Sequence, residues 1–304
     1  MSPRAVIDVG SNTIHLLVGE VEDGAVMPIT GEKISARLGS GVDKTGRIED
    51  LRIPIAAEAI TLFARLAAMH GVSEPAVLAT SAVRDAENGP ELIEEVRERA
   101  GLKMRLISGD EEALLGFRGA VSALGSGFSP APALVVDLGG GSAQLILGDA
   151  INGPRKQVSL PLGSNRITER FVEHDPPKSS ELEALREAVP GMLPDWKVNE
   201  GTAVVAIGGS ARAILKLTSD PLTVESMVKL AAEISRKPSV VLAREEGLAP
   251  ERARVLPAAI ITLAAVLECF GGEQLTVARG GIREGAILTM DEEALNEGDP
   301  KRET

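Results

Sequence analysis

Two short runs of small residues could hold a phosphate group, and each run follows an aspartate. In such turns, glycines let backbone N–H groups come close to a phosphate, and hydroxyl side chains add further donors. The preceding residues, Asp8 and Asp137, could bind a divalent cation that neutralises phosphate charge, or each could cap its own turn. The runs consist of Gly10, Ser11, Asn12 and Thr13 in the first and Gly139, Gly140, Gly141 and Ser142 in the second.

The sequence around the two runs repeats without a gap. Residues 6–19 align with residues 135–148 at a constant offset of 129, and both segments have the pattern of strand, turn, strand. General similarity between β-hairpins is the alternative explanation. Because each copy begins one half of the chain, the repeat favours two homologous domains.

Three charged residues could act on a phosphate. Arg84 follows a strand expected at 76–80, where its guanidinium could bind phosphate oxygens or pair with a nearby acid. Glu111 and Glu112 lie in the first turn of a helix expected from residue 110 to about 124. Acidic residues there also complement the helix dipole, so their position alone does not assign them to catalysis.

The elements around these residues alternate in type along the chain. Short, partly alternating apolar runs predict strands at the start of each half, and apolar residues at helical spacing predict the helices that follow. Residues 125–132 have the composition of a linker. We therefore expect an α/β protein with an N-terminal domain at 1–124 and a C-terminal domain at 125–304. The first strands are expected at 5–9, 14–21, 25–29 and 33–38, and the first long helix at 54–70.

Composition excludes several classes of protein. The 304 residues carry a net charge of −12 and 2% aromatic residues, which argues against a nucleic-acid partner. One cysteine excludes a disulfide framework. No uncharged apolar stretch reaches the roughly 18 residues of a membrane span, and the start has no signal-peptide pattern. We expect a cytoplasmic protein without a membrane partner.

Five blocks in the sequence resemble the exopolyphosphatase / guanosine pentaphosphate phosphohydrolase (Ppx/GppA) family, in its short two-domain form. The resemblance implies membership of the actin-like ATPase superfamily. It also implies two ribonuclease-H-like domains with an active-site cleft between them. The blocks occur in the family's order at residues 7–13, 80–86, 107–113, 136–142 and 281–285.

The resemblance also assigns roles to residues. Glu112 matches the family's catalytic glutamate, which would orient and deprotonate water, and Arg84 would stabilise charge on the transferred phosphoryl group. Asp8 and Asp137 would hold Mg²⁺, and the two small-residue runs would bind substrate phosphate. A further small-residue loop expected near the phosphates consists of Gly208, Gly209 and Ser210.

These assignments predict a phosphoanhydride hydrolase that releases orthophosphate from the end of inorganic polyphosphate. A guanosine pentaphosphate 5′-phosphohydrolase is the nearest alternative, because the same residues would serve both substrates. A small-molecule kinase and a non-enzymatic actin-like protein also stay open. The resemblance leaves open whether the protein is a homodimer.

Overall fold

The computed structural model describes residues 2–124, 132–149 and 152–297. By its contacts the chain divides into two compact units, one of residues 1–127 with 280–304 and one of residues 128–279. The sequence assigned all of 125–304 to one domain, whereas the contacts place the last helix with the first unit. The reason is that this helix packs against the first unit's fifth helix and first strands. Apart from Pro132, the expected linker lies outside the described residues.

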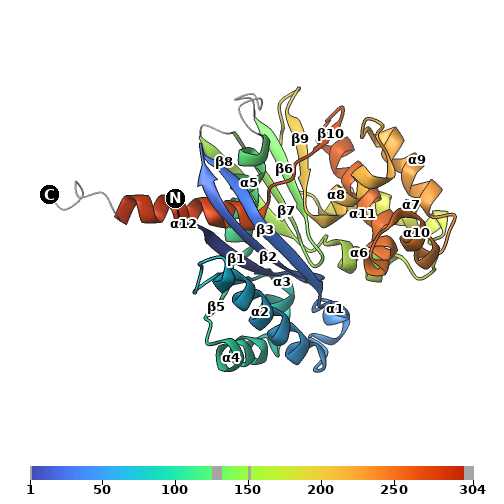
Figure 1. Cartoon of the computed structure of the whole chain (residues 1–304). Coiled ribbons are helices and arrows are strands. Elements are labelled where there is room, and N and C mark those ends of the chain that lie inside the picture. Colours follow the sequence, from blue (N-terminus) through green and yellow to red (C-terminus); the bar gives the residue numbers. More distant parts are fainter. Residues whose placement is uncertain (1, 125–131, 150–151, 298–304) are drawn as a thin grey trace. The chain divides into compact units, whose positions relative to one another are not determined.

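The first unit contains a mixed five-stranded sheet in the order β3-β2-β1-β4-β5 (Figure 1). Strands β3, β2 and β1 pair antiparallel, and β1, β4 and β5 pair parallel. The strands are β1 (Arg4–Val9), β2 (Thr13–Glu22), β3 (Ala25–Ser35), β4 (Ala76–Ala79) and β5 (Met104–Leu106). The helices are α1 (Val42–Thr45), α2 (Arg52–Met69), α3 (Ser81–Asp85), α4 (Gly89–Ala100), α5 (Gly109–Leu124) and α12 (Ile282–Glu297).

One expected break in this sheet is absent. The sequence predicted separate strands at 25–29 and 33–38, but β3 continues through Gly31 because residues on both sides of the expected break pair with β2. The pairing contains a register shift between Val18 and Gly19, which is a β-bulge that interrupts the ladder while the strand continues.

Alternation along β1 directs its side chains to two different helix layers. Ala5, Ile7 and Val9 belong to a core with α2 and α4. Val6 belongs to a second core with residues of α5 and α12. Because alternate residues share a face, Asp8 lies on the face that α5 and α12 cover.

The second unit contains an equivalent sheet in the order β10-β9-β6-β7-β8. Read from its other edge, β8, β7, β6, β9 and β10 correspond to β3, β2, β1, β4 and β5. Its strands are β6 (Ala133–Leu138), β7 (Ala143–Asp149), β8 (Gly153–Leu160), β9 (Ala203–Ile207) and β10 (Leu275–Val277). Its helices are α6 (Ser164–Phe171), α7 (Ser179–Ala188), η2 (Val189–Met192), α8 (Gly209–Leu217), α9 (Val224–Ile234), α10 (Ser239–Glu246) and α11 (Pro250–Cys269). The apolar α11 forms much of this unit's core.

The pairing register confirms the repeat of 129 residues. Val9 pairs with Ile14 in the first hairpin, and Leu138 pairs with Ala143 in the second. The parallel neighbours of β1 and β6, which are β4 and β9, pair at the same offset. The register shift also recurs at this offset, between Leu147 and Gly148. The two units therefore share a topology as well as a sequence pattern. Among the residues described, none of the helices has both the length and the apolar character needed to cross a bilayer.

Candidate active site

The first small-residue turn joins β1 to β2, and backbone N–H groups donate hydrogen bonds to its carbonyl groups. The N–H of Gly10 donates to the carbonyl of Thr13 at 3.3 Å, which closes the turn. The carbonyls of Ser11 and Asn12 accept from the N–H groups of Gly39 (2.8 Å) and Arg37 (2.9 Å). These bonds fix the peptide groups of the turn. In the described part of the chain, the N–H groups of Ser11 and Asn12 donate no hydrogen bond.

The second turn joins β6 to β7 and is built in the same way. The N–H of Gly139 donates to the carbonyl of Ser142 at 3.0 Å, and the carbonyls of Gly139 and Gly140 accept from Ser164 (2.8 Å) and Asn165 (2.9 Å) at the start of α6. Within the described residues, the N–H groups of Gly140 and Gly141 also donate no hydrogen bond. Each turn thus combines anchored carbonyls with free N–H donors, as phosphate binding by a backbone requires.

A glycine makes the second arrangement possible. A Cβ on Gly163 would lie 2.3–2.4 Å from backbone atoms of Gly140, Gly141 and Ser142. Only a residue without a side chain allows α6 to approach this closely. Gly39 serves the first turn similarly, because a Cβ there would lie 2.8 Å from the Cβ of Ser11.

Arg84 and Glu112 come together within the first unit. Arg84 lies on α3, a short helix that directly follows β4, and Glu112 lies in the first turn of α5. Nη1 of Arg84 donates to Oε2 of Glu112 at 3.3 Å and to the carbonyl of Ile107 at 3.0 Å. The Glu112 side chain is 5% exposed, so its carboxylate is buried beside the guanidinium. A buried carboxylate held by an arginine is suited to orient a water molecule and receive a proton.

Glu111 faces a different environment from its neighbour. Its carboxylate pairs with Arg105, whose side chain is about half exposed. The adjacent glutamates therefore lie on different faces of α5. Glu112 thus lies beside Arg84 and Glu111 beside Arg105, and the assignment of the chemistry to Glu112 stays a prediction.

A buried hydrogen bond links the first turn to the helix that carries Arg84. The hydroxyl groups of Ser11 and Ser81 lie 3.0 Å apart, and both residues are buried. Ser81 is the first residue of α3. The turn, Arg84 and Glu112 thus form one connected region of the first unit.

Asp8 lies at the carboxyl end of β1, next to this turn. It pairs in register with His15 on β2, so the two side chains share the sheet face that α5 and α12 cover. Nδ1 of His15 lies 3.4 Å from Nη1 of Arg283 on α12. The neighbouring Glu284 accepts a hydrogen bond from the N–H of Gly281 at 2.8 Å and so stabilises the start of that helix.

Asp137 holds the equivalent position in the second unit and is 6% exposed. Its cross-strand partner is Gln144, which is fully buried. Nε2 of Gln144 donates to the hydroxyls of Ser142 (2.8 Å) and Ser159 (3.1 Å). Oε1 of Gln144 is buried and has no hydrogen-bond partner among the described residues. A buried acceptor without a donor costs stability, so this oxygen is chemically suited to accept a hydrogen bond or to ligate a cation.

The predicted loop of Gly208, Gly209 and Ser210 lies beside Asp137. Gly208 has a φ of 97° and precedes α8, and a Cβ on it would lie 3.0 Å from Oδ1 of Asp137. This is a position that only glycine fits without strain. Asp137, Gln144 and the loop therefore gather at one end of the second unit's sheet.

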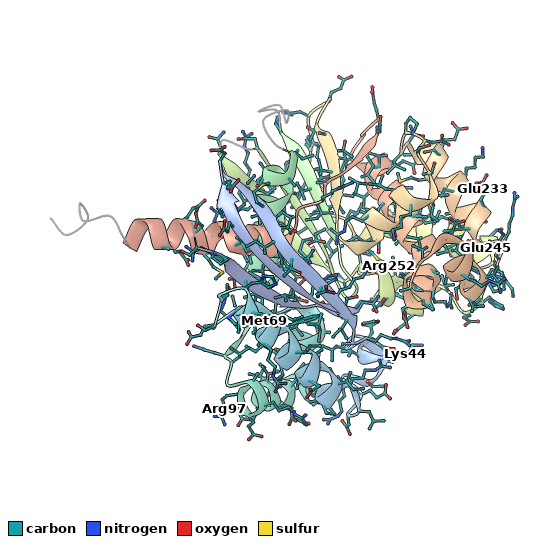
Figure 2. All side chains as sticks on the ribbon, in the orientation of Figure 1. Lys44, Met69, Arg97, Glu233, Glu245 and Arg252 are labelled. Carbon is teal, nitrogen blue, oxygen red and sulfur yellow. The ribbon has the colours of Figure 1, made fainter. Side chains whose placement is uncertain are left out.

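An arginine that no sequence motif identified contacts this loop. Nη1 of Arg252, on α11, donates to the hydroxyl of Ser210 at 2.6 Å, and a Cβ on Gly209 would lie 2.5 Å from Nη2 (Figure 2 labels Arg252). Burial, together with repulsion from Arg212, lowers the pKa of Arg252 to about 10, so it stays charged at neutral pH. The described ion pairs include none with Arg252. Two neighbouring cations at the start of a helix form a suitable site for an anion.

Among the described residues, one further cluster of side chains of metal-ligand type lies outside these regions. Glu173, His174 and Glu181 bring their ligand atoms within 4.8 Å of one another. The carboxylate of Glu181, however, already accepts hydrogen bonds from the N–H groups of Glu173, His174 and Lys178. The cluster therefore connects a loop to α7.

The predicted site residues thus lie in the two turns, near the ends of the strands beside them and in the helices that follow, each within its own unit. The prediction of a cleft between the units, and the roles given to individual residues, remain predictions. Gln144 and Arg252 were missed. Gln144 had one available signal, because it occupies the repeat position of His15, whereas Arg252 is one of several arginines in helical sequence.

Comparison with known proteins gives a consistent result along the chain. Residues 17–294 match the Ppx/GppA phosphatase family. Exopolyphosphatase 1 of Mycobacterium tuberculosis (strain H37Rv) is 31% identical over 95% of this chain and 88% of its own.

Solved structures agree in fold. The crystal structure of the Aquifex aeolicus member of the Ppx/GppA family is 27% identical, with a TM-score of 0.77 over 98% of this chain and 99% of that one. An exopolyphosphatase from Cytophaga hutchinsonii, at 24% identity, shares the fold with a TM-score of 0.86 over 96% of this chain and 98% of that one. The expected α/β fold with two actin-like, ribonuclease-H-like domains is confirmed.

Proposed function

The chain belongs to the Ppx/GppA phosphatase family, and we propose that it is an exopolyphosphatase. It would cleave the terminal phosphoanhydride bond of inorganic polyphosphate, with water as the acceptor. The observation that carries the proposal is the buried Glu112 carboxylate held by Arg84 at 3.3 Å, next to a turn with free N–H donors. The exopolyphosphatase among its relatives supports the choice of substrate.

The residues of the first unit would perform the chemical step. Glu112 orients a water molecule and takes its proton as the oxygen attacks the terminal phosphorus. The bridging P–O bond breaks, and the products are orthophosphate and a polymer shortened by one phosphate. Arg84 contacts neighbouring groups through Nη1 and Nε, so its Nη2 is available to a phosphate oxygen.

The residues of the second unit would bind phosphate and a cation. Asp137 and the buried Oε1 of Gln144 are oxygen ligands on one face of a hairpin, and such ligands fit Mg²⁺. Asp8 would supply the equivalent carboxylate at the turn of the first unit. Bound Mg²⁺ would neutralise charge on the phosphates. Arg252 and the loop from Gly208 to Ser210 would hold a phosphate through charge and N–H donors.

Phosphate release by the purified chain tests this proposal. We expect orthophosphate release from polyphosphate in the presence of Mg²⁺, and a loss of at least about 10³-fold in kcat in Glu112→Gln. Glu111→Gln is the matched control, because the adjacent carboxylate pairs with Arg105 at the surface; its kcat should stay within about twofold.

Substrate choice is decided by parallel assays. Polyphosphates of several lengths and guanosine pentaphosphate are compared at equal enzyme concentration. Faster turnover of guanosine pentaphosphate would replace the proposed substrate with the alternative. No release from polyphosphate, or an active Glu112→Gln, would overturn the proposal.

A further inference from the structure

Asn88 is a buried amide between α3, the short helix that carries Arg84, and α4. Its side chain makes two hydrogen bonds to one residue of a distant segment. Oδ1 of Asn88 accepts from the N–H of Ile48 at 2.8 Å, and Nδ2 donates to the carbonyl of Ile48 at 2.9 Å. The N–H of Glu87 adds a bond to the carbonyl of Gly46 at 2.9 Å. The amide thus satisfies a buried backbone donor and a buried backbone acceptor together.

The segment that Asn88 holds is also bonded to the first small-residue turn. Residues 36–48 lead from the end of β3 through α1 toward α2. Near the start of this segment, the N–H groups of Arg37 and Gly39 donate to the carbonyls of Asn12 and Ser11. Near its end, Ile48 pairs with Asn88. One segment therefore connects the turn to the chain that follows α3.

These contacts fix α3 beyond both of its ends. At its start, the hydroxyl of Ser81 lies 3.0 Å from that of Ser11, and Asn88 lies three residues after its last residue. The helix has only five residues and no side-chain hydrogen bond at its N-cap, so it has little stability of its own. A Cβ on Gly89 would lie 2.0 Å from the carbonyl oxygen of Val83, so α4 begins in close contact with α3. The position of α3 therefore depends on its anchors.

Arg84 needs such a fixed helix for the role proposed above. Its Nη1 donates to the carbonyl of Ile107 at 3.0 Å and to Glu112 at 3.3 Å. A displacement of about 1 Å at a reacting group can lower a rate about 10²-fold. We infer that Asn88 is a positioning residue for Arg84, which fixes α3 so that the guanidinium meets Glu112 and the terminal phosphate together. This inference rests on the proposed function.

The competing explanation is that Asn88 contributes to stability alone. Asn88→Ala leaves the N–H and the carbonyl of Ile48 buried without partners, so it should lower the Tm. The matched control is Thr61→Ala, which removes a buried hydrogen bond of 2.8 Å to Ala57 on α2 of the same unit. Should Asn88→Ala fail to fold, Asn88→Ser takes its place in every comparison, because its hydroxyl can bind Ile48 through a water molecule.

Steady-state kinetics at a temperature where all variants are folded separates the two explanations. Asn88→Ala should lower kcat for polyphosphate about tenfold, with KM within about threefold, whereas Thr61→Ala should change kcat less than about twofold. In an Arg84→Lys background the guanidinium fork is already lost, so adding Asn88→Ala (R84K/N88A) should lower kcat by less than about threefold. An unchanged kcat in Asn88→Ala, or the same tenfold loss in both backgrounds, would overturn the inference.

Hydrogen exchange provides a readout that needs no turnover. Deuterium uptake by residues 80–86, measured by mass spectrometry, should be faster in Asn88→Ala than in the original protein and unchanged in Thr61→Ala. Equal uptake in all three proteins would refute the positioning role whatever the activity. A chain that releases no phosphate would instead overturn the proposed function, and the exchange measurement would still decide whether Asn88 fixes α3.

Discussion

Arg84 and Glu112 are 28 residues apart in the chain, and their side chains meet with Nη1 3.3 Å from Oε2. The contact depends on two helix starts. The short helix α3 begins directly after β4, and α5 begins shortly after the neighbouring strand β5. Because β4 and β5 are parallel, both helices begin at the same edge of the sheet. The topology of the sheet thus positions the pair. Because Arg84 makes more than one contact, its role depends on the shape of the guanidinium group as well as on its charge.

Replacement of Arg84 by lysine should therefore impair hydrolysis although the charge remains. Lysine cannot contact Glu112, Ile107 and a phosphate together, because it lacks the planar fork. We expect kcat to fall about 10²-fold. The circular dichroism spectrum of the variant should match that of the original protein, which would show that the variant is folded. A kcat within threefold of the original would show that Arg84 supplies only a point charge.

Arg252 should affect substrate binding more than the chemical step. Arg252→Lys keeps a cation near Ser210 but loses the fork that fits between Ser210 and Gly209. The KM for polyphosphate should rise about tenfold, with kcat changed by less than threefold. Steady-state kinetics measures both, and Arg186→Lys, at an exposed pair with Glu268, is the control. Equal effects of the two variants would argue against a phosphate at this loop.

Gln144 should set the dependence on Mg²⁺. Gln144→Leu removes the buried Oε1 beside Asp137, and we expect about tenfold more Mg²⁺ for half-maximal activity. Gln144→Glu adds a charged ligand and should lower that concentration. Titrations of activity against Mg²⁺ measure both shifts, and a thermal unfolding series with Mg²⁺ provides a readout independent of turnover. Identical Mg²⁺ curves for all three proteins would remove Gln144 from the cation site.

The contact between α5 and α12 should not tolerate a methyl group. A Cβ on Gly119 would lie 2.0 Å from the carbonyl oxygen of Gly281, so Gly119→Ala forces the two helices apart. We expect a loss of about 2–3 kcal/mol in the free energy of unfolding. Gly191→Ala, where a Cβ meets nothing within 4 Å, is the control. Urea unfolding compares the two, and equal stabilities would show that the helices can separate at little cost.

Glu181 should stabilise the second unit in a pH-dependent way. Burial raises the pKa of this carboxyl, but hydrogen bonds from the His174 side chain and from the N–H groups of Lys178, Glu173 and His174 outweigh it and hold the pKa at about 2. A folded-state pKa below the ordinary value of 4.5 means that the stabilisation is complete above pH 4.5 and is lost as the pH falls toward 2. Glu181→Gln should cost about 1–2 kcal/mol at pH 7 and less at pH 3.

Urea unfolding at the two pH values measures this difference. Glu183→Gln, at an exposed position on the same helix, should show no such dependence. A Glu181→Gln deficit that is the same at pH 7 and pH 3 would mean that the carboxyl contributes through shape alone.

The repeat in the sequence predicted more of the fold than any single motif. It aligned two hairpins without a gap, and hydrogen-bonded strands can preserve such a register only if the turns match. It also located Asp8 and Asp137 at equivalent positions. The destination of α12 could not be predicted, because helical periodicity shows an apolar face and does not show which sheet covers it.

The two candidate site residues that were not predicted from the sequence, Gln144 and Arg252, were missed for a similar reason: neither has a local sequence signal. Arg252 and Ser210 are 42 residues apart, and their 2.6 Å contact arises from the packing of α11 against α8. Arginine in a helix of ordinary sequence gives no local signal of such a contact. Gln144 was overlooked because an amide within an apolar strand has no charge to mark it. The free N–H groups of both turns, in contrast, follow from their composition and were predicted.

The path of α12 has a consequence for how the protein is made. The second unit is one continuous stretch of residues, 128–279, whereas the first unit lacks its final helix until residues beyond 280 are available. On the ribosome, the second unit can complete its core while the sheet face around Val6 and Leu17 is still uncovered. The half of the chain that is synthesised first is therefore finished last, and nascent chains halted before α12 should be the substrates of chaperones and proteases.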